Sequence, residues 1–234
     1  MIVMSDRYIK GFLRLMKAQN YKINTRPYEV NIVGVRSTST IPNKFDDRLY
    51  IFWKDDKGNW EGHDYAITSD PGTYWLKKPM NVDGTAILKE GQWEYKIGSH
   101  RGYRALNQRG KVTVIRDYDR NAVLDFNNGK ETTGYFGINI HKASATGTST
   151  NVDKWSAGCQ VFANSEDFAD FMNLVQRSVD KYGNDTIYYT LVDERAFARS
   201  LKRYFVYGII AFGVTFALYG GYKFVVGKPF LPKL

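Results

Sequence analysis

The chain has 234 residues, of which 43% are hydrophobic and 15% aromatic, and this composition supports a packed core and excludes a disordered protein. Its single cysteine, Cys159, excludes an internal disulfide, so the fold does not depend on oxidation. The formal net charge of +9 indicates attraction to an anionic partner, or simply a solvated basic surface. The basic residues are scattered along the chain, so no specific nucleic-acid partner is expected.

The first predicted element is an amphipathic helix near the N-terminus. Ser5 can cap it, and apolar side chains follow at the spacing of one helical face: Ile9, Phe12, Leu13 and Met16. Charged residues at positions 6, 7, 10 and 14 interrupt any apolar run, so no secretion signal is expected. Pro27 breaks the helical pattern, and we assign residues 1–28 to this helix and its lead-in.

A mostly β domain with an α+β organisation is expected over residues 29–194. Strand-like runs occupy 29–35, 48–54 and 63–69, and the turn signal DDKGNW predicts a hairpin between the second and third runs. The turn-rich stretch 69–93 is interpreted as long loops around one short strand. Four further strands are predicted by β-branched, aromatic and other apolar residues, at 111–119, 134–141, 158–163 and 186–192.

The last predicted helix of this domain follows the cysteine. Ser165 begins it, with two acidic residues in the first turn, and Gly183 ends it. Its apolar face carries Phe168, Phe171, Met172, Val175 and Val179.

Cys159 and one histidine stand at the ends of two predicted strands. The run GYFGINIH ends at His141, and SAGCQVF places Cys159 at the start of the next strand. A thiol attacks carbonyls as a thiolate, and a neighbouring imidazole is the usual base that produces one near neutral pH. Gly158 permits a tight turn, and the backbone N–H of Cys159 can face a developing oxyanion. An isolated cysteine is more often a small core residue, so this pair by itself leaves both interpretations open.

The spacing between these residues adds a family resemblance. A histidine, fourteen intervening residues and then SAGC resembles the signature of the L,D-transpeptidase (YkuD-like) catalytic domain, in a divergent branch found in bacteriophage genomes. GYFGINIH is similar to the strand that leads to that family's histidine, and the resemblance covers roughly residues 64–192.

This resemblance implies a β-sandwich-like domain with one internal helix and a thiol that attacks the stem peptides of peptidoglycan. Cys159 would be acylated and the terminal D-residue released, while His141 takes and returns the proton. An amine acceptor would give a cross-link, and water would give hydrolysis. Ser156 matches the position that shapes the motif turn or orients the imidazole, and Gly158 matches the motif glycine.

Two departures from the family pattern concern specificity. Ala157 stands where the family often has a second histidine, and Gln160 and Val161 follow the cysteine in place of an apolar residue and then Arg or Asn. The family's substrate contacts at these positions therefore do not carry over to this chain.

Four residues are candidates for substrate binding: His100, Arg101, Tyr103 and Trp155. The first three lie in a Gly-bracketed basic loop, in which an arginine fork can bind stem-peptide carboxylates, although an exposed basic loop without a ligand explains the pattern equally well. RDYDR at 116–120 alternates in sign and is interpreted as a surface ladder, and His63 as a strand residue without a partner. The three histidines and one cysteine lack metal-ligand spacing, so no metal and no cofactor are expected.

A membrane helix is predicted at the C-terminus. Residues 204–222 carry no charge and have tyrosines at both ends, and a bilayer needs about 20 such residues. We assign 195–203 to a basic juxtamembrane linker, 204–226 to the transmembrane helix and 227–234 to a short tail. A buried core helix is the alternative. The anchor predicts a location in the cell envelope or a phage virion, with virion or membrane proteins as possible partners.

Three functions are compatible with these features. The first is a cysteine acyltransferase or peptidase on peptidoglycan stem peptides, used by a phage to remodel or lyse the wall. The second is a non-catalytic module that binds the wall, and the third is a membrane-anchored structural protein.

Overall fold

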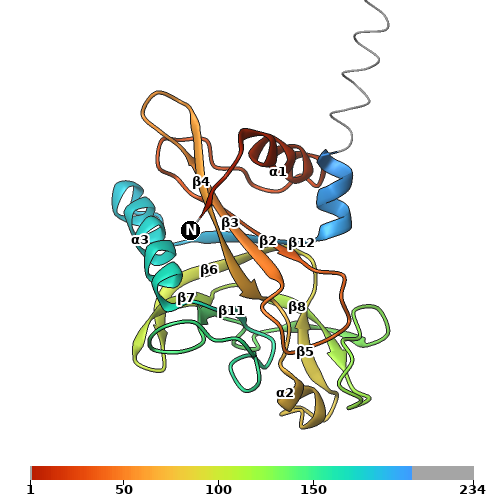
Figure 1. The fold of residues 1–234 in the computed structure, drawn as a ribbon. Helices are drawn as coiled ribbons and strands as arrows, with labels where there is room; N and C mark the ends of the chain where they lie inside the picture. The colour runs from red at the N-terminus through yellow and green to blue at the C-terminus, as the bar shows by residue number, and fades with distance from the viewer. Residues whose placement is uncertain (1, 202–234) are drawn as a thin grey trace, which may run out of the picture.

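A computed structural model describes residues 2–201 of the chain (Figure 1). These residues form one nine-stranded sheet, one three-stranded sheet, the helices α1 to α3 and a helical segment at 194–201. The expected mostly β, α+β class is therefore confirmed. The large sheet contains β1 (Ile2–Val3), β2 (Asn31–Arg36), β3 (Asp47–Lys54), β4 (Trp60–Thr68), β6 (Gly91–His100), β7 (Tyr103–Gln108), β10 (Ile140–Lys142), β11 (Gln160–Phe162) and β12 (Ile187–Asp193). The small sheet contains β5 (Thr85–Leu88), β8 (Val112–Asp117) and β9 (Lys130–Gly134), and the helices are α1 (Asp6–Ala18), α2 (Thr73–Lys77) and α3 (Ser165–Tyr182).

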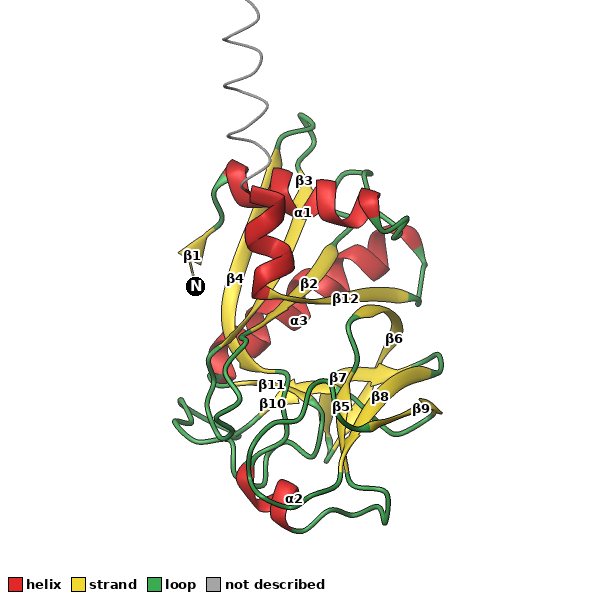
Figure 2. Cartoon of the chain, turned by 90° about the vertical axis from the view of Figure 1, so that its right-hand side faces the viewer, coloured by secondary structure: helices red, strands yellow, loops and turns green. Residues whose placement is uncertain are grey.

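The strand order of the large sheet closes on itself. It runs β1-β4-β11-β10-β7-β6-β12-β2-β3, and β4 also pairs with β3. Eight strands therefore form a ring, with β1 added beside β4. Two neighbouring pairs, β10–β11 and β2–β12, are parallel, and the others are antiparallel. The small sheet, in the order β5-β8-β9, lies with α2 at the end of the molecule opposite α1 (Figure 2).

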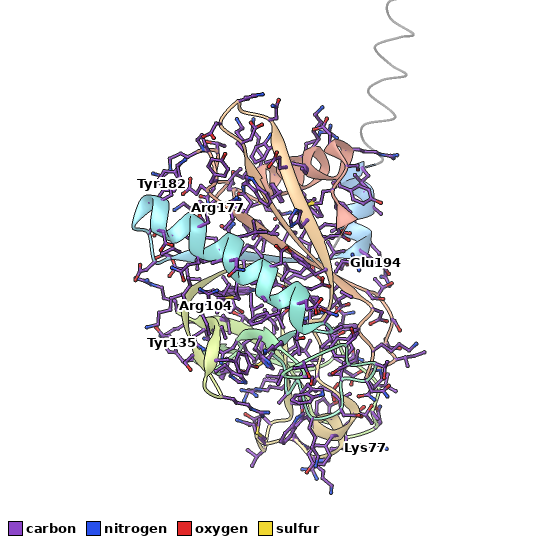
Figure 3. All side chains as sticks on the ribbon, turned by 60° about the vertical axis from the view of Figure 1, so that its left-hand side comes forward. Lys77, Arg104, Tyr135, Arg177, Tyr182 and Glu194 are labelled. Carbon is purple, nitrogen blue, oxygen red and sulfur yellow. The ribbon has the colours of Figure 1, made fainter. Side chains whose placement is uncertain are left out.

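The main core is rich in aromatic side chains. Tyr65, Tyr95 and Tyr189 are fully buried in it, and the apolar face of α3 completes it with Phe168, Phe171 and Met172. Burial of one such side chain contributes roughly 1.5–3 kcal/mol. Figure 3 shows α3 lying across the outside of the sheet, with Arg104 of β7 beside it, and the Arg104 guanidinium donates to Asn173 and Gln176 of the helix.

Both predicted amphipathic helices are present, with small differences at their caps. α3 begins at Ser165 as predicted, and Asn164 caps it, because its side-chain oxygen accepts from two backbone N–H groups of the first turn. Gly183 ends α3 in the left-handed conformation, as expected. Ser5 makes no side-chain capping bond to α1, and the buried face of α1 includes Leu15, whereas Leu13 is half-buried.

The predicted β3–β4 hairpin is confirmed, with Gly58 at a φ of 84° in its turn. GYFGINIH, by contrast, is not one continuous strand. β9 ends at Gly134, the backbone is irregular over 135–139, and β10 begins at Ile140. The Gln108 side-chain oxygen accepts from the N–H groups of Phe136 and Ile138. This side chain therefore accepts the backbone hydrogen bonds that a neighbouring strand would accept in a regular sheet.

The predicted basic loop around His100 is a hairpin between β6 and β7. Arg101 and Gly102 form its two-residue turn, with φ of 49° and 84°. Two successive positive φ values are the mark of a type I′ turn, which matches the twist of the flanking strands. Arg101 is exposed at this turn, while His100 and Tyr103 pair across the strands.

The predicted transmembrane helix and tail, 204–234, lie outside the described residues. No helix within residues 2–201 is long and apolar enough to cross a membrane.

Candidate functional site

The cysteine stands on a turn that is held by hydrogen bonds. Ser156 is fully buried, its hydroxyl donates to the Cys159 carbonyl at 2.8 Å, and it accepts from the Gly158 N–H at 3.1 Å. Gly158 has a φ of 121°, and a Cβ at this position would lie 2.4 Å from the Ala86 carbonyl oxygen. Only glycine fits this turn, which delivers the thiol to the start of β11.

Parallel pairing brings the histidine next to this turn. Ile140 of β10 lies opposite Gln160 of β11, and His141 lies opposite Val161. Continuing this register places Cys159 opposite Asn139, two residues before His141, and the two-residue period of strands puts the side chains of Cys159 and His141 on the same face. Their side chains form no direct hydrogen bond among the described contacts. The Cys159 sulfur instead accepts from the Asn139 N–H and donates to the Gly137 carbonyl, both at 3.5 Å.

The surroundings of His141 define its tautomer. Its ring is 2% exposed, and Nδ1 lies 2.8 Å from the Lys142 carbonyl oxygen, which can only accept. The neutral imidazole therefore carries its proton on Nδ1 and presents a lone pair at Nε2. Burial lowers the pKa of His141 to about 4, with smaller contributions from the charges of His100 and Arg101. At neutral pH this ring is an uncharged base.

A second histidine stacks on the first. The rings of His100 and His141 have centroids 4.2 Å apart and planes 16° from parallel. The Asn139 side-chain oxygen accepts from the Gln108 N–H, so its amide nitrogen faces Nδ1 of His100 at 3.4 Å and donates to it. His100 therefore carries its proton on Nε2, which is buried and has no hydrogen-bond partner among the described residues. This N–H is a free donor beside the base.

Burial also keeps the thiol protonated. It raises the pKa of Cys159, while the Asn139 N–H and the charge of Arg101 lower it by less. The sequence predicts that a nearby imidazole converts the thiol to a thiolate. In the structure the Nε2 lone pair of His141 makes no hydrogen bond to the Cys159 sulfur, so the resting form is the neutral thiol. The backbone N–H of Cys159 donates to no acceptor among residues 2–201.

A pocket of about 210 Å³ adjoins the motif turn. Its walls include Trp75, Phe136, Ile138 and Ala157, and Arg116 contributes a charge. Ile138 lies between Gly137 and Asn139, which contact the sulfur, and Ala157 lies within the motif turn.

Arg116 is buried without a matching acid. It is 6% exposed, its guanidinium donates to the Thr132 hydroxyl and the Gly84 carbonyl, and it lies over the Phe136 ring. It forms no salt bridge within the described part of the chain, and burial lowers its pKa while the charge of Asp83 raises it. RDYDR is therefore not a surface ladder, because Arg116 and Asp117 are both buried.

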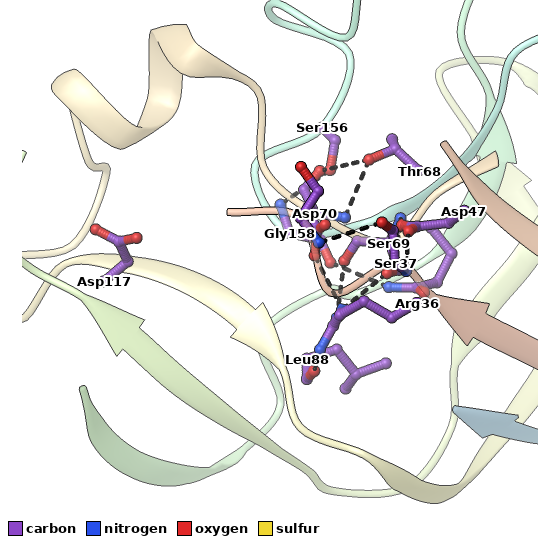
Figure 4. Close-up of polar contacts among 12 residues, drawn as sticks. Arg36, Ser37, Asp47, Thr68, Ser69, Asp70, Leu88, Asp117, Ser156 and Gly158 are labelled. Atoms are coloured by element: carbon purple, nitrogen blue, oxygen red, sulfur yellow. Dashed lines mark hydrogen bonds and ion pairs between the residues drawn. The ribbon is translucent and has the colours of Figure 1, made fainter. Parts of the chain in front are cut away.

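A buried network of polar side chains lies next to the turn (Figure 4). Arg36 pairs with Asp70 at 2.9 Å, and Asp47 accepts from the backbone N–H and hydroxyl of Ser69. Two residues after Asp70, the Gly72 N–H donates to the Ser156 carbonyl at 3.0 Å. The network thereby fixes the segment that holds the motif turn.

The structure places seven of the eight predicted site residues in two groups. Cys159, Ser156 and Gly158 form the turn, while His141, His100 and Tyr103 lie on β10, β6 and β7 beside it, and Arg101 at the hairpin turn is close enough for its charge to act on the thiol. The Tyr103 hydroxyl donates to the Lys142 carbonyl at 3.1 Å and so supports the same acceptor as His141. Ser156 does not orient the imidazole, because its hydroxyl and carbonyl are used elsewhere.

The substrate-binding role of Trp155 stays a prediction, whereas His63 differs from its interpretation as a residue without a partner. Trp155 lies on the loop before the turn and is not among the residues that line the pocket, where Trp75 of α2 supplies the indole. His63 has a partner, since its Nδ1 lies 3.1 Å from an Asp170 carboxylate oxygen. Asn139, Gln108 and Arg116 were not predicted, because their roles depend on contacts between segments distant in sequence.

No protein-family model, curated protein or solved structure matches this chain.

Proposed function

We propose that this protein is a cysteine-dependent acyltransferase or peptidase that acts on peptidoglycan stem peptides. The observation that carries the proposal is the neutral His141 base, two residues along the parallel strand pair from the position opposite Cys159. The resemblance of the His-to-SAGC spacing to L,D-transpeptidases supplies the substrate class.

The proposed reaction follows from the protonation states. His141 Nε2 accepts the thiol proton as the Cys159 sulfur attacks a peptide carbonyl carbon, and the Cys159 backbone N–H donates to the oxyanion. The C–N bond then breaks, the departing amine takes the proton from His141, and a thioester remains on the sulfur. An amine or water attacks this thioester, gives its proton to the imidazole, and the sulfur leaves and regains the proton.

The thiol of Cys159 and the imidazole of His141 are both neutral before the reaction. The proton therefore moves from the sulfur to the imidazole while the sulfur attacks the carbonyl carbon, and not before. An ion pair between thiolate and imidazolium would need the opposite pKa shifts from those that burial causes here. Bound substrate excludes water and shortens catalytic hydrogen bonds that are long in the free enzyme, so the gap between base and sulfur is compatible with this reaction.

Arg116 supports a substrate with a carboxylate. A buried guanidinium without an acidic partner is unfavourable unless a ligand supplies the anion, and arginine binds carboxylates in a two-pronged geometry. Stem peptides carry free carboxylates at their termini, and the pocket that contains Arg116 adjoins the motif turn.

The finer fold and the location belong to the same proposal. We propose that the closed sheet is a divergent form of the family's β-sandwich, with residues 204–226 as a membrane anchor. The anchor would hold the enzyme at the cell envelope or in a phage virion.

The direct test is conversion of purified muropeptides by the full-length chain, followed by mass spectrometry. We expect new masses for loss of the terminal residue or for cross-linking. Cys159→Ala should abolish conversion, and His141→Gln should slow it by about 10²–10⁴-fold, the usual contribution of a general base. His63→Gln is the matched control, because this histidine pairs with Asp170 away from the thiol. Equal activity of Cys159→Ala would refute the thiol mechanism.

A wall-binding module without chemistry is the second candidate, and the near-complete burial of His141 favours it. It predicts that the protein sediments with purified cell walls while no muropeptide changes mass, and that Cys159→Ala sediments equally well.

A further inference from the structure

The segment that follows β8 carries oxygen ligands at regular intervals. In DYDRNAVLD, residues 117–125, carboxylates or amides occupy the first, third, fifth and ninth positions: Asp117, Asp119, Asn121 and Asp125. Calcium-binding loops present side-chain oxygens at the same alternate positions, followed by a backbone carbonyl at the seventh. Val123 supplies that position here.

The three carboxylates converge in space. One oxygen from each of Asp117, Asp119 and Asp125 lies within 4.8 Å of the others. None of the three forms a salt bridge within residues 2–201. Like charges at this separation repel one another unless a cation lies between them.

Asp117 provides independent evidence that a ligand belongs there. It is fully buried, one carboxylate oxygen accepts from the Asp125 N–H at 3.1 Å, and the other is buried with no hydrogen-bond partner in the described structure. Figure 4 shows its side chain apart from the network around Arg36, so that network does not satisfy it. A buried carboxylate oxygen without a donor is costly, and a bound cation would remove this cost.

We propose that the loop 117–125 binds a calcium ion through the side-chain oxygens of Asp117, Asp119 and Asp125. The donors are all oxygens, which excludes the nitrogen and sulfur environment preferred by zinc. An irregular loop that offers carboxylate and backbone oxygens suits the six to eight ligands of calcium better than the strict octahedron of magnesium. Asn128 stands at the twelfth position, where strong calcium loops have glutamate, so the affinity is lower than in those loops.

A bound ion would also fix a neighbouring part of the fold. Leu124 within the loop is buried against Leu76 of α2 and Ile87 of β5, and its N–H donates to the Thr40 carbonyl. The ion would hold Leu124 in this small core. Calcium binding does not depend on the proposed enzymatic function, and its test does not use activity.

The test is terbium luminescence of the full-length chain after removal of metals. Terbium replaces calcium at oxygen sites, and the exposed Tyr118 within the loop serves as the sensitiser. We expect saturable emission with one terbium per chain, displaced by calcium and not by an equal concentration of magnesium. Asp119→Asn, at an exposed position, should weaken terbium binding at least about tenfold, as expected when a calcium site loses one of its ligand charges.

Asp117→Asn tests the buried ligand and keeps an acceptor for the Asp125 N–H. Glu61→Gln is the matched control, since it removes one exposed carboxylate from β4. Circular dichroism of each variant shows whether it is folded. Absence of emission from the folded wild-type chain, equal displacement by magnesium, or unchanged binding in folded Asp119→Asn would each overturn the proposal.

Discussion

Burial keeps both members of the candidate pair uncharged. It raises the pKa of the Cys159 thiol and lowers that of the His141 imidazole, because a charged form of either group loses hydration. Among the described residues, the Arg101 charge and the Asn139 N–H oppose the effect on the thiol. Both side chains are therefore neutral at pH 7 in the free protein.

This state predicts slow chemical labelling of Cys159. At pH 7 iodoacetamide should react more slowly than with free cysteine, because a pKa raised by one unit reduces the thiolate fraction about tenfold. The rate should rise with pH to beyond the ordinary thiol pKa. Arg101→Gln should slow labelling further, since it removes a charge that favours the thiolate. Arg104→Gln, whose guanidinium contacts α3, is the control. Labelling faster than free cysteine would contradict the uncharged state.

Arg116→Met separates stability from substrate binding. Removing a buried cation without an acidic partner should leave the melting temperature unchanged or higher. A hydrogen bond to a charged group contributes about 1.5–3 kcal/mol, so the KM for stem peptides should rise about tenfold to a hundredfold. Thermal melts and muropeptide kinetics measure the two effects. A lower melting temperature with an unchanged KM would assign Arg116 a structural role only.

At the scale of elements, the motif turn depends on one glycine. Gly158→Ala should destabilise the fold by about 1–3 kcal/mol for its φ of 121°, with a further cost from contact with the Ala86 carbonyl. The displaced thiol should also reduce conversion of muropeptides. Gly183→Ala is the matched control, because its φ is 62° and a Cβ there meets no atom within 4 Å. We expect it to cost only about 1 kcal/mol in urea denaturation and to leave conversion unchanged.

The network next to the turn predicts a pH dependence of stability. Burial raises the pKa of Asp70 to about 8 from 3.8, against the opposing charge of Arg36 and with smaller additions from Asp47 and Asp46. The native state thus holds a proton that the unfolded chain releases. Its contribution to stability is complete below about pH 4 and is lost as the pH rises to about 8.

Asp70→Asn measures this contribution, because the amide does not titrate. As the pH rises from 4 to 8, the free energy of unfolding of the wild type should fall relative to that of the variant. Urea denaturation at several pH values gives this difference. A difference that does not vary with pH would show that Asp70 is ionised in the native state.

Local patterns in the sequence predict those helices and hairpins that are determined by residues close to one another in the chain. The helices containing Phe12 and Phe168 and the β3–β4 hairpin follow from periodicity and turn residues, and the structure contains all three. The hairpin around Arg101 was missed because its strands are polar and its turn lacks the Asn-Gly signal. The strand assignments predict that the strands carrying His141 and Cys159 can be neighbours. The tautomer of His141 depends on the Lys142 carbonyl and on burial, and the sequence reveals neither.

At the scale of the whole molecule, the packing of α1 on β2 and β3 predicts that this helix unfolds together with the ring of strands. Phe12 of α1 is fully buried, and its ring stacks on Phe197 with centroids 4.1 Å apart, beyond the last strand of the ring. The same cluster contains Val33 of β2 and Phe52 of β3. α1 is thus packed on the β domain, in agreement with the single apolar face that its sequence predicts.

Phe12→Ala tests this cooperativity. Loss of a buried phenylalanine typically costs 3–5 kcal/mol, and we expect a cost of about this size with one unfolding transition seen by both circular dichroism and tryptophan fluorescence. Val82→Ala, at a side chain that is 95% exposed, should change little. If α1 were an independent attachment, Phe12→Ala would produce a small early transition and leave the main one at the wild-type urea concentration. Coincident shifts of both probes would instead show that the helix and the ring of strands unfold together, so that residues distant from Cys159 determine whether its turn persists.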